Sequence, residues 1–438
     1  QNRCSQSIKG FISNSPADKV LTMLAKSNTS PLADELLIDA EPMEPRALHR
    51  GREALWLLLA LILVAINLRP ALSSLAPVLR QVQTSLDLNS TAAGLLTTLP
   101  VLCLGLFAPL ATRLAQRHGT ERIVLRALLF LACGILLRGL FGSIGLFAGT
   151  LMAGGSIGVI GVLLPGIVKR EFPDSADIMT GVYTMALCFG AALAAGATVP
   201  LTRVFDSWPL ALSFWALPAV LAAIAWRPQM RRSHPHAAIK TSNAPLWRNR
   251  LAWQVTLYMG LQSSLAYCVF GWLAVILQDR GVNTVASGLI VSASIMVQLI
   301  SALGAPWLAT RHRDQRPMIA IVLALTLAGL LGCLYAPADT LMIWAVILGL
   351  GQGGTFSMAL SLIVLRTPDA STAARLSVMA QGIGYTLASL GPLLLGLVHE
   401  VTHGWNAAGW LFTGIVLTAF MAGMGAGRQG HVLSSQSR

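Results

Sequence analysis

The stretch EALWLLLALILVAINLRPALSSLAPVL, residues 53–79, is apolar and long enough to cross a membrane, yet it carries Arg69 followed directly by Pro70. A helix of roughly 20 apolar residues spans the hydrocarbon layer of a bilayer. An arginine keeps its charge in a protein, and at the centre of such a helix it costs roughly 2.5–3.5 kcal/mol. Proline has no N–H, so the carbonyl of Ile66 loses its helical partner. We therefore expect a break here, with Arg69 turned away from helical dihedral angles.

The composition of the whole chain is that of a polytopic membrane protein. Of its 438 residues, 55% are hydrophobic and only 11% are charged, whereas soluble domains carry about 25% charged residues. Forty glycines fit the same class, because glycine is common in membrane helices. The net charge of +13 follows from 31 basic and 18 acidic residues. Their placement beside apolar stretches explains that charge, so we expect a lipid bilayer and no nucleic acid as partner.

Twelve apolar stretches of spanning length alternate with short polar loops. They lie at about 54–79, 91–112, 122–141, 143–168, 177–202, 208–226, 251–277, 284–309, 317–335, 340–365, 373–398 and 405–427. Basic residues concentrate in the loops on one side, among them Arg113, Lys169 and Arg227, while the opposite loops hold few. Because basic loops stay in the cytoplasm, this pattern predicts twelve transmembrane helices with both termini cytoplasmic.

The chain repeats itself halfway along. APLATR at 108–113 is similar to APWLATR at 305–311, and each lies at the inner end of the second span of its half. An even number of spans per half gives both halves the same orientation, which is a parallel repeat with the solute site between the halves. The predicted divisions are a flexible cytoplasmic tail at 1–52 with a native start at Met43, a six-helix bundle at 53–227, a basic cytoplasmic linker at 228–250, a second six-helix bundle at 251–427, and a cytoplasmic tail at 428–438.

Several segments together resemble one transporter family. INLRPALSSLAPVL, GLLTTLPVLCLGLFAPLATRLAQRHGTER, VLLPGIVKREFPDSADIMTGVYTMAL and VLRTPDASTAARLSVMAQGIGYTLASLGPLLLG are similar to the cyanate/nitroimidazole porter family of the major facilitator superfamily, over about 54–427. The resemblance implies an all-α fold of two parallel-repeat bundles. It also implies alternating-access transport of small solutes, from anions to nitroaromatics, across the cytoplasmic membrane of a bacterium.

The loop after the second span departs from the signature of that superfamily. TRLAQRHGTER keeps Arg117, Gly119 and Arg122, but Thr112 replaces a glycine and Gln116 an aspartate. The resemblance implies a gating role for the three retained residues, with Gly119 forming the tight turn. The alternative is that the arginines only supply positive charge on the inner side.

Polar side chains inside the spans are the candidates for solute binding. In addition to Arg69, they are Asn67 beside the break, Gln254, Tyr258 and Gln262 at helical spacing in span seven, Gln352 and Thr355 in span ten, and Gln381 and Tyr385 in span eleven. Residues four apart share one helix face. We expect these stripes to face Arg69 across a cavity; the alternative is that each side chain only bonds a neighbouring helix. Asn67 either binds the solute or braces the bend.

The acidic residues decide which solutes suit the chain. Every Asp and Glu falls in a tail, a loop or the end of a span, so no carboxylate stands ready to hold a cation at mid-membrane. Arg69 is the one ionisable residue deep in a span, and such a residue is by default a functional candidate. This inventory predicts a small anionic or strongly dipolar solute, cyanate-like in character. Export of neutral nitroaromatic or drug-like compounds is the alternative, as is a purely structural Arg69.

The segment HEVTH, residues 399–403, opens a different class of function. On a helix, His399 and His403 would share a face and bind zinc, with Glu400 as general base of a metalloprotease. The motif lies at the end of a span just before Gly404, so we favour a polar cap over a metal site. We expect no enzyme activity, no cofactor and no metal, in a monomer whose partner is a small-molecule solute; a coupling proton is left open.

Overall fold

The computed structural model describes residues 51–172, 176–232, 246–310, 314–368, 370–428 and 430–432, and every regular element in these ranges is a helix. Most of the predicted tails at 1–52 and 428–438, the start at Met43 and most of the linker at 228–250 lie outside the described residues. The described residues from Trp56 onward belong to one compact unit. It contains every helix discussed below except residues 51–55 at the start of the first helix.

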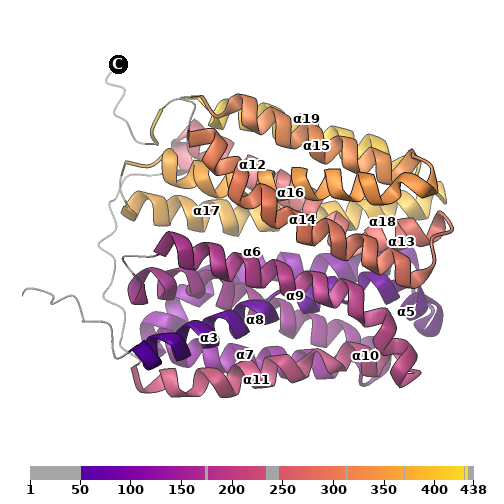
Figure 1. Cartoon of the computed structure of the whole chain (residues 1–438), viewed down its shortest axis with the longest axis horizontal. Coiled ribbons are helices and arrows are strands. Elements are labelled where there is room, and N and C mark those ends of the chain that lie inside the picture. Colours follow the sequence, from indigo (N-terminus) through magenta and orange to yellow (C-terminus); the bar gives the residue numbers. More distant parts are fainter. Residues whose placement is uncertain are drawn as a thin grey trace, which may run out of the picture. The chain divides into compact units, whose positions relative to one another are not determined.

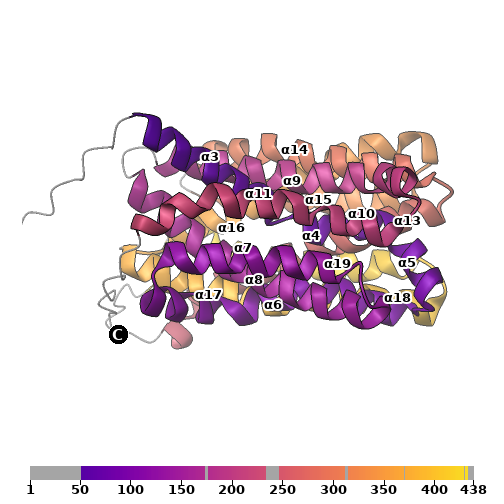
Figure 2. The same ribbon diagram turned by 90° about the horizontal axis from the view of Figure 1, so that it is seen from below.

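The described helices fall into an earlier and a later group along the chain (Figures 1 and 2). The first half contains α3 (Gly51–Asn67), α4 (Pro70–Ser73), η1 (Ala76–Val78), α5 (Leu79–Leu86), α6 (Ser90–His118), α7 (Thr120–Leu137), α8 (Gly142–Glu171), α9 (Ala176–Phe205), α10 (Trp208–Phe214), α11 (Ala216–Trp226) and η3 (Arg227–Arg232). The second half contains η4 (Leu246–Arg248), α12 (Arg250–Cys268), the π-helical turn η5 (Val269–Leu273), α13 (Ala274–Asp279), α14 (Thr284–Thr310), α15 (Arg316–Tyr335), η6 (Ala338–Thr340), α16 (Leu341–Leu365), α17 (Ala370–Ala388), α18 (Leu390–Thr402) and α19 (Ala408–Ala426).

Eleven helical segments among the described residues are long and apolar enough to cross a membrane, so the chain is a multi-pass membrane protein. The stretch expected to be the third span forms helix α7, which carries Glu121, Arg122 and Arg126 and is not among these eleven segments. The count of twelve spans and the cytoplasmic termini stay predictions. We call the end of the helices that holds α5 and α13 the predicted outer end.

Helix packing in the second half repeats that in the first. In the first half α6 and α7 both pack on α8, and α11 packs on α7; in the second half α14 and α15 pack on α16, and α19 packs on α15. The halves meet through two symmetric pairs, α6 against α17 and α9 against α14. In Figure 1 the helices of the second half accordingly lie above those of the first, and these pairs meet between them.

Glycines permit the closest of these approaches. On α16, a Cβ at Gly349 would lie 2.3 Å from the carbonyl oxygen of Ser294 on α14, and one at Gly353 would lie 2.2 Å from that of Gln298. The segment GLGQGG at 349–354 is therefore a helix-packing surface, because only residues without a side chain let the two backbones come this near.

Candidate functional site

The first span is broken at the predicted position. Helix α3 ends at Asn67 and α4 begins at Pro70. One expectation is wrong, however: Arg69 has φ −112° and ψ −27°, which lies in the right-handed helical region. The reason is that its carbonyl oxygen accepts from the N–H groups of Leu72 and Ser73, at 2.9 and 3.1 Å. The Arg69 carbonyl therefore accepts the first backbone hydrogen bonds of α4. These bonds outweigh the steric bias that the following proline imposes on Arg69.

Contacts from other helices stabilise the break. The amide nitrogen of Asn67 donates to the carbonyl oxygens of Leu63 at 2.7 Å and Pro218 at 3.1 Å. Because both amide hydrogens are used in this way and the side chain is 2% exposed, Asn67 braces the bend. On the other side α9 comes so close that a Cβ at Gly190 would lie 2.0 Å from the carbonyl oxygen of Ile66. The break is thus a packed element of the fold.

Arg69 lies at a cavity formed by both halves of the chain. The empty volume is about 630 Å³, including the part that opens to solvent. The half-buried guanidinium carbon of Arg69 lies 5.4 Å from the ring centre of Phe270 and 5.9 Å from that of Tyr267, which is also its hydrogen-bond partner. The other lining residues are Thr184, Leu187, Cys188 and Ala191 on α9, Gln262, Ser263 and Ala266 on α12, Ile295, Gln298 and Ala302 on α14, and Gln352, Gly353 and Phe356 on α16.

The cavity offers amides and hydroxyls beside one permanent positive charge. No Asp or Glu is among its lining residues. The amide nitrogen of Gln298 lies 3.3 Å from Oε1 of Gln352, so these two side chains bond each other. Gln262 donates to the hydroxyl of Ser263 at 2.7 Å, while its Oε1 is buried without a hydrogen-bond partner among the described residues. Since unsatisfied buried acceptors are rare, this oxygen is available to a solute.

The remaining candidates from the sequence are not among the lining residues of the cavity. The Tyr258 hydroxyl is buried and lies 3.4 Å from the carbonyl oxygen of Thr355 on α16. The Thr355 hydroxyl donates to its own helix at Gln352, and Gln381 donates to Ser377 at 2.7 Å. Gln254 packs against Gly425 on α19, and Tyr385 packs edge-on against Tyr267 with ring centres 6.1 Å apart. Only Arg69, Gln262 and Gln352 of the predicted set line the cavity.

The loop between α6 and α7 has the predicted turn. Gly119 adopts φ +85°, which L side chains rarely allow, and Arg117 and Arg122 are exposed on either side of it. The structure adds an acidic partner that we had not predicted: Glu121 is 2% exposed and forms an ion pair with Arg170 at the end of α8. The indole nitrogen of Trp226 donates to the Glu121 carbonyl at 3.0 Å. Glu121 therefore links α7, α8 and α11 at the predicted inner end.

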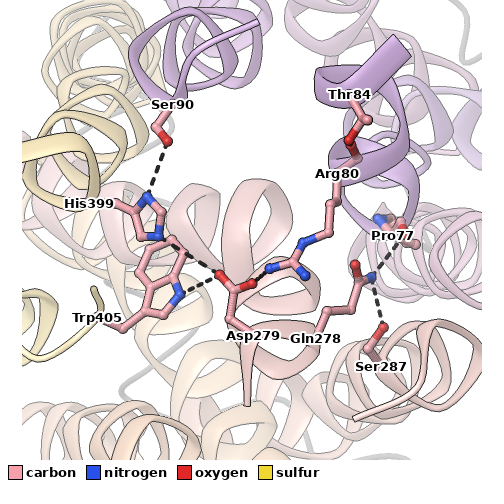
Figure 3. A network of polar contacts seen from close by, with 9 residues as sticks. All are labelled: Pro77, Arg80, Thr84, Ser90, Gln278, Asp279, Ser287, His399 and Trp405. Atoms are coloured by element: carbon pink, nitrogen blue, oxygen red, sulfur yellow. Dashed lines mark hydrogen bonds and ion pairs between the residues drawn. The ribbon is translucent and has the colours of Figure 1, made fainter. Parts of the chain in front are cut away.

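At the predicted outer end, a polar network connects the two halves (Figure 3). Arg80 on α5 forms an ion pair with Asp279, the last residue of α13. Asp279 also accepts from the indole nitrogen of Trp405 at 2.8 Å and lies 3.8 Å from Nε2 of His399. Nδ1 of His399 in turn lies 3.1 Å from the hydroxyl of Ser90, the first residue of α6. We call these five residues, together with Glu400, the outer network.

The geometry of HEVTH contradicts the zinc-protease alternative. Helix α18 ends at Thr402, and His403 adopts φ +49°, outside the helix. Glu400 accepts from the backbone N–H of Thr91 at 2.6 Å and from the amide of Asn89 at 3.3 Å, so its carboxylate is occupied by the start of α6. No cluster of three potential metal ligands occurs within the described ranges. His399 and Glu400 join the two halves of the chain.

Comparison with known proteins decides the family. The model of the Major Facilitator Superfamily matches residues 55–389 and 288–429. The chain belongs to this superfamily. It is 37% identical to the "Uncharacterized transporter YycB" of Bacillus subtilis (strain 168), over 90% of this chain and 99% of the relative. It is 37% identical to the 2-nitroimidazole transporter of Escherichia coli (strain K12), over 86% and 97%, and 31% identical to the cyanate transport protein CynX of the same organism, over 83% and 95%.

The fold of a solved superfamily member agrees. The D-xylose–proton symporter superposes with a TM-score of 0.68 at 12% identity, over 87% of this chain and 98% of the symporter. This chain is accordingly a transporter of small solutes and not an enzyme.

Sequence reasoning missed several residues of the cavity and the outer network. Tyr267 and Phe270 lie three residues apart in AYCVFGW, where an aromatic pair in a largely aliphatic span was a usable signal. Gln298 is the only amide in its span, and it was equally visible. Asp279 and Arg80 had no such signal, because a charge at the end of a span is normal.

Proposed function

We propose that this chain is a secondary transporter that moves a small anionic or strongly dipolar solute by alternating access, with Arg69 as the central binding group. The observation that carries the proposal is a half-buried arginine at a cavity that both halves line and that contains no carboxylate. A fixed positive charge without a counter-ion favours an anion. The chain's relatives include one protein named for cyanate transport.

The chemistry of the walls narrows the solute. A guanidinium presents a rigid planar fork of N–H donors, which suits flat or linear anions with delocalised charge. The Gln262 amide oxygen stays available as an acceptor, and the rings of Tyr267 and Phe270 cover the apolar face of the site. A cyanate-like or carboxylate-like anion fits the guanidinium and the two rings, whereas the spare amide oxygen suits a solute that also carries an N–H or O–H donor.

A neutral nitroaromatic solute is the second candidate. The same rings of Tyr267 and Phe270, with that of Phe356 in the same cavity, give surfaces on which a flat heterocycle stacks. Arg69 would then bond the nitro oxygens, which carry a strong dipole but no net charge. The 37% identity to a 2-nitroimidazole transporter favours this reading.

The outer network supplies the gate that alternating access requires. It joins α5 and α6 of the first half to α13 and α18 of the second at the predicted outer end. A solute reaches Arg69 from that end only after the Arg80–Asp279 pair and the Ser90 and Thr91 contacts have separated. In the proposed cycle, this arrangement is the state with the outer gate closed.

The test is binding to purified full-length protein, because a bound solute raises the unfolding temperature by mass action. Cyanate is expected to stabilise the wild type and to lose all effect in Arg69→Ala, whose unfolding temperature without solute stays unchanged. Arg69→Lys keeps the charge but loses the fork, and should bind about tenfold more weakly. Arg203→Ala, at an exposed arginine on α9, is the matched control.

Three outcomes are decisive. Normal cyanate binding in Arg69→Ala, or a variant that merely unfolds, would make Arg69 structural and overturn the anion proposal. Stabilisation of the wild type by 2-nitroimidazole and not by cyanate would establish the neutral solute. Stabilisation by cyanate that requires Arg69 would establish the anion.

A further inference from the structure

A second arginine is buried near the path to the cavity. Arg138 follows the last residue of α7 and is 1% exposed. Its Nη1 donates to the carbonyl oxygen of Ala71 on α4 at 2.8 Å. Its Nε and Nη2 have no hydrogen-bond partner among the described residues, and no described carboxylate forms an ion pair with it. Two donors of a permanent cation are therefore left over inside the protein.

Arg366 shows what a structural arginine looks like in this chain. It is also buried, at 5% exposed, and it lies after the last residue of α16. Its Nε donates to the carbonyl oxygen of Ala426 at 2.8 Å, and its Nη2 bonds Gln315 and the carbonyl oxygen of Gly427. Buried charges are normally satisfied in this way. Arg138, by contrast, has only one acceptor.

The position of Arg138 is built into the helix packing. On α8, a Cβ at Gly149 would lie 2.7 Å from the backbone nitrogen of Arg138 and 2.9 Å from its Cγ. A glycine at this point therefore gives the side chain its place between α7 and α8. The arginine is consequently fixed where it lies.

Arg138 lines a small cavity that adjoins the central one. Its other polar lining residues are Thr97 on α6 and Tyr267, and both Tyr267 and Phe270 also line the cavity at Arg69. Thr97 lies seven residues along α6 from Ser90 of the outer network, or roughly 10 Å at 1.5 Å per residue. Arg138 therefore lies between the outer network and Arg69. With the gate closed, the space holds about one water molecule.

We propose that Arg138 forms a second anion site, which an anion occupies between the outer gate and Arg69. This inference rests on the anion transport proposed above. The cavity is lined by α4 and α6 of the first half and by Tyr267, Phe270 and Gly271 of the second, so it widens when the halves separate at the outer end. Nε and Nη2 then donate to the anion while Nη1 stays on Ala71. Tyr267 and Phe270 divide the two positions, and the anion passes from one guanidinium to the next.

The experiment is equilibrium dialysis of radiolabelled cyanate against purified full-length protein. Only label released on dilution is counted, because cyanate also carbamylates amines. We expect two reversibly bound anions per wild-type chain, one in Arg69→Gln, one in Arg138→Gln and none in the double variant. Arg366→Gln, which removes another buried arginine whose Nε and Nη2 have acceptors, should retain both.

Arg138→Lys tests the second site even if Arg138→Gln fails to fold. It keeps the charge and a donor for Ala71, and the second anion should bind about tenfold more weakly because the planar fork is lost. Wild-type affinity at both positions in Arg138→Lys would overturn the second site, as would a single anion in the wild type that Arg138→Gln leaves in place. No binding to the wild type at all would overturn the anion function itself, and the second site with it.

Discussion

Among single residues of the cavity, Gln262 leads to the most specific prediction for solute binding. Its amide nitrogen is held by Ser263, and its buried oxygen has no hydrogen-bond partner among the described residues. The amide is therefore already oriented before a solute arrives, and it is 2% exposed. A side chain fixed in this way selects solutes that donate a hydrogen bond or carry a positive edge beside Arg69.

We expect Gln262→Leu to weaken solute binding and leave stability nearly unchanged. A hydrogen bond is worth roughly 0.5–1.5 kcal/mol, so the dissociation constant should rise about three- to tenfold. Calorimetric titration with 2-nitroimidazole, whose ring N–H can donate to the Gln262 oxygen, measures it. Gln254→Leu, two turns away on α12 and packed against Gly425, is the control and should bind as the wild type does. Equal loss in both variants would contradict a specific contact at Gln262.

Features that depend on the backbone of a single residue could be predicted from the sequence. The break at Pro70 and the turn at Gly119 follow from the backbone of one residue, and both lie where we expected them. The spacing of Gln254, Tyr258 and Gln262 correctly indicates a shared stripe, but the stripe meets α19 at one end and the cavity at the other. Which part of a helix face meets which neighbour depends on tertiary packing, and that information is absent from a local pattern.

At the scale of elements, the first span depends on a close approach by α9. Gly190 lets the α9 backbone reach the Ile66 carbonyl, and the hydroxyl of Ser73 donates to the Ala191 carbonyl at 2.9 Å. The fixed orientation of Arg69 therefore results from α9 as much as from Pro70. A side chain at position 190 would push the two elements apart.

Gly190→Ala should lower the unfolding temperature by several degrees and weaken solute binding, because overpacking costs roughly 1–3 kcal/mol. The matched control is Gly166→Ala on α8, where an added Cβ meets nothing within 4 Å. Thermal unfolding with and without cyanate separates the two effects. If both variants unfold at the same temperature, the contact with Ile66 does not support the break.

HEVTH shows the limit of motif reading at the same scale. The spacing would suit a zinc helix, but the end of α18 before His403 and the contacts of Glu400 with α6 rule that out. The end of α18 was predictable from Gly404. The contacts of Glu400 with α6 were not, because Glu400 and Thr91 are 309 residues apart in the sequence. Long-range pairings of charges need the packed fold.

At the scale of the whole molecule, the halves are held together by helix pairs in the middle and by the outer network at one end. A Cβ at Gly105 on α6 would lie 2.4 Å from the hydroxyl of Thr386 on α17. The interface is therefore close and carries small residues. In the proposed transport cycle the two packed surfaces rock against each other, and the outer network sets how often they separate.

Asp279→Asn should open the outer gate, because it removes the charge that pairs with Arg80. Spin labels at exposed Thr84 on α5 and Val401 on α18 report the separation, which we expect to shift to longer distances. Asp339→Asn, at an exposed carboxylate in η6 at the same end, is the control. An unchanged distance distribution in Asp279→Asn would mean that the ion pair does not hold the gate.

The two halves, expressed as separate chains ending and starting within 228–250, should reassociate and retain some transport. The symmetric contacts α6–α17 and α9–α14 provide the interface. Gly105→Leu should prevent co-purification, whereas Gly161→Leu on α8, with nothing within 4 Å of its added Cβ, should not. Complete failure of the unmodified halves to co-purify would contradict a two-bundle protein.

The outer network also makes the gate sensitive to the ionic strength of the medium. The first half contributes Arg80, 54% exposed, and the amino end of α6, whereas the second contributes the carboxylates of Asp279 and Glu400. Opposite charges that meet at an exposed surface attract less as dissolved ions screen them, and the screening length falls from about 30 Å at 0.01 M to about 8 Å at 0.15 M salt. The closed state is consequently most favoured in dilute surroundings, and a saline environment shifts the same molecule toward the open gate without any change in its solute.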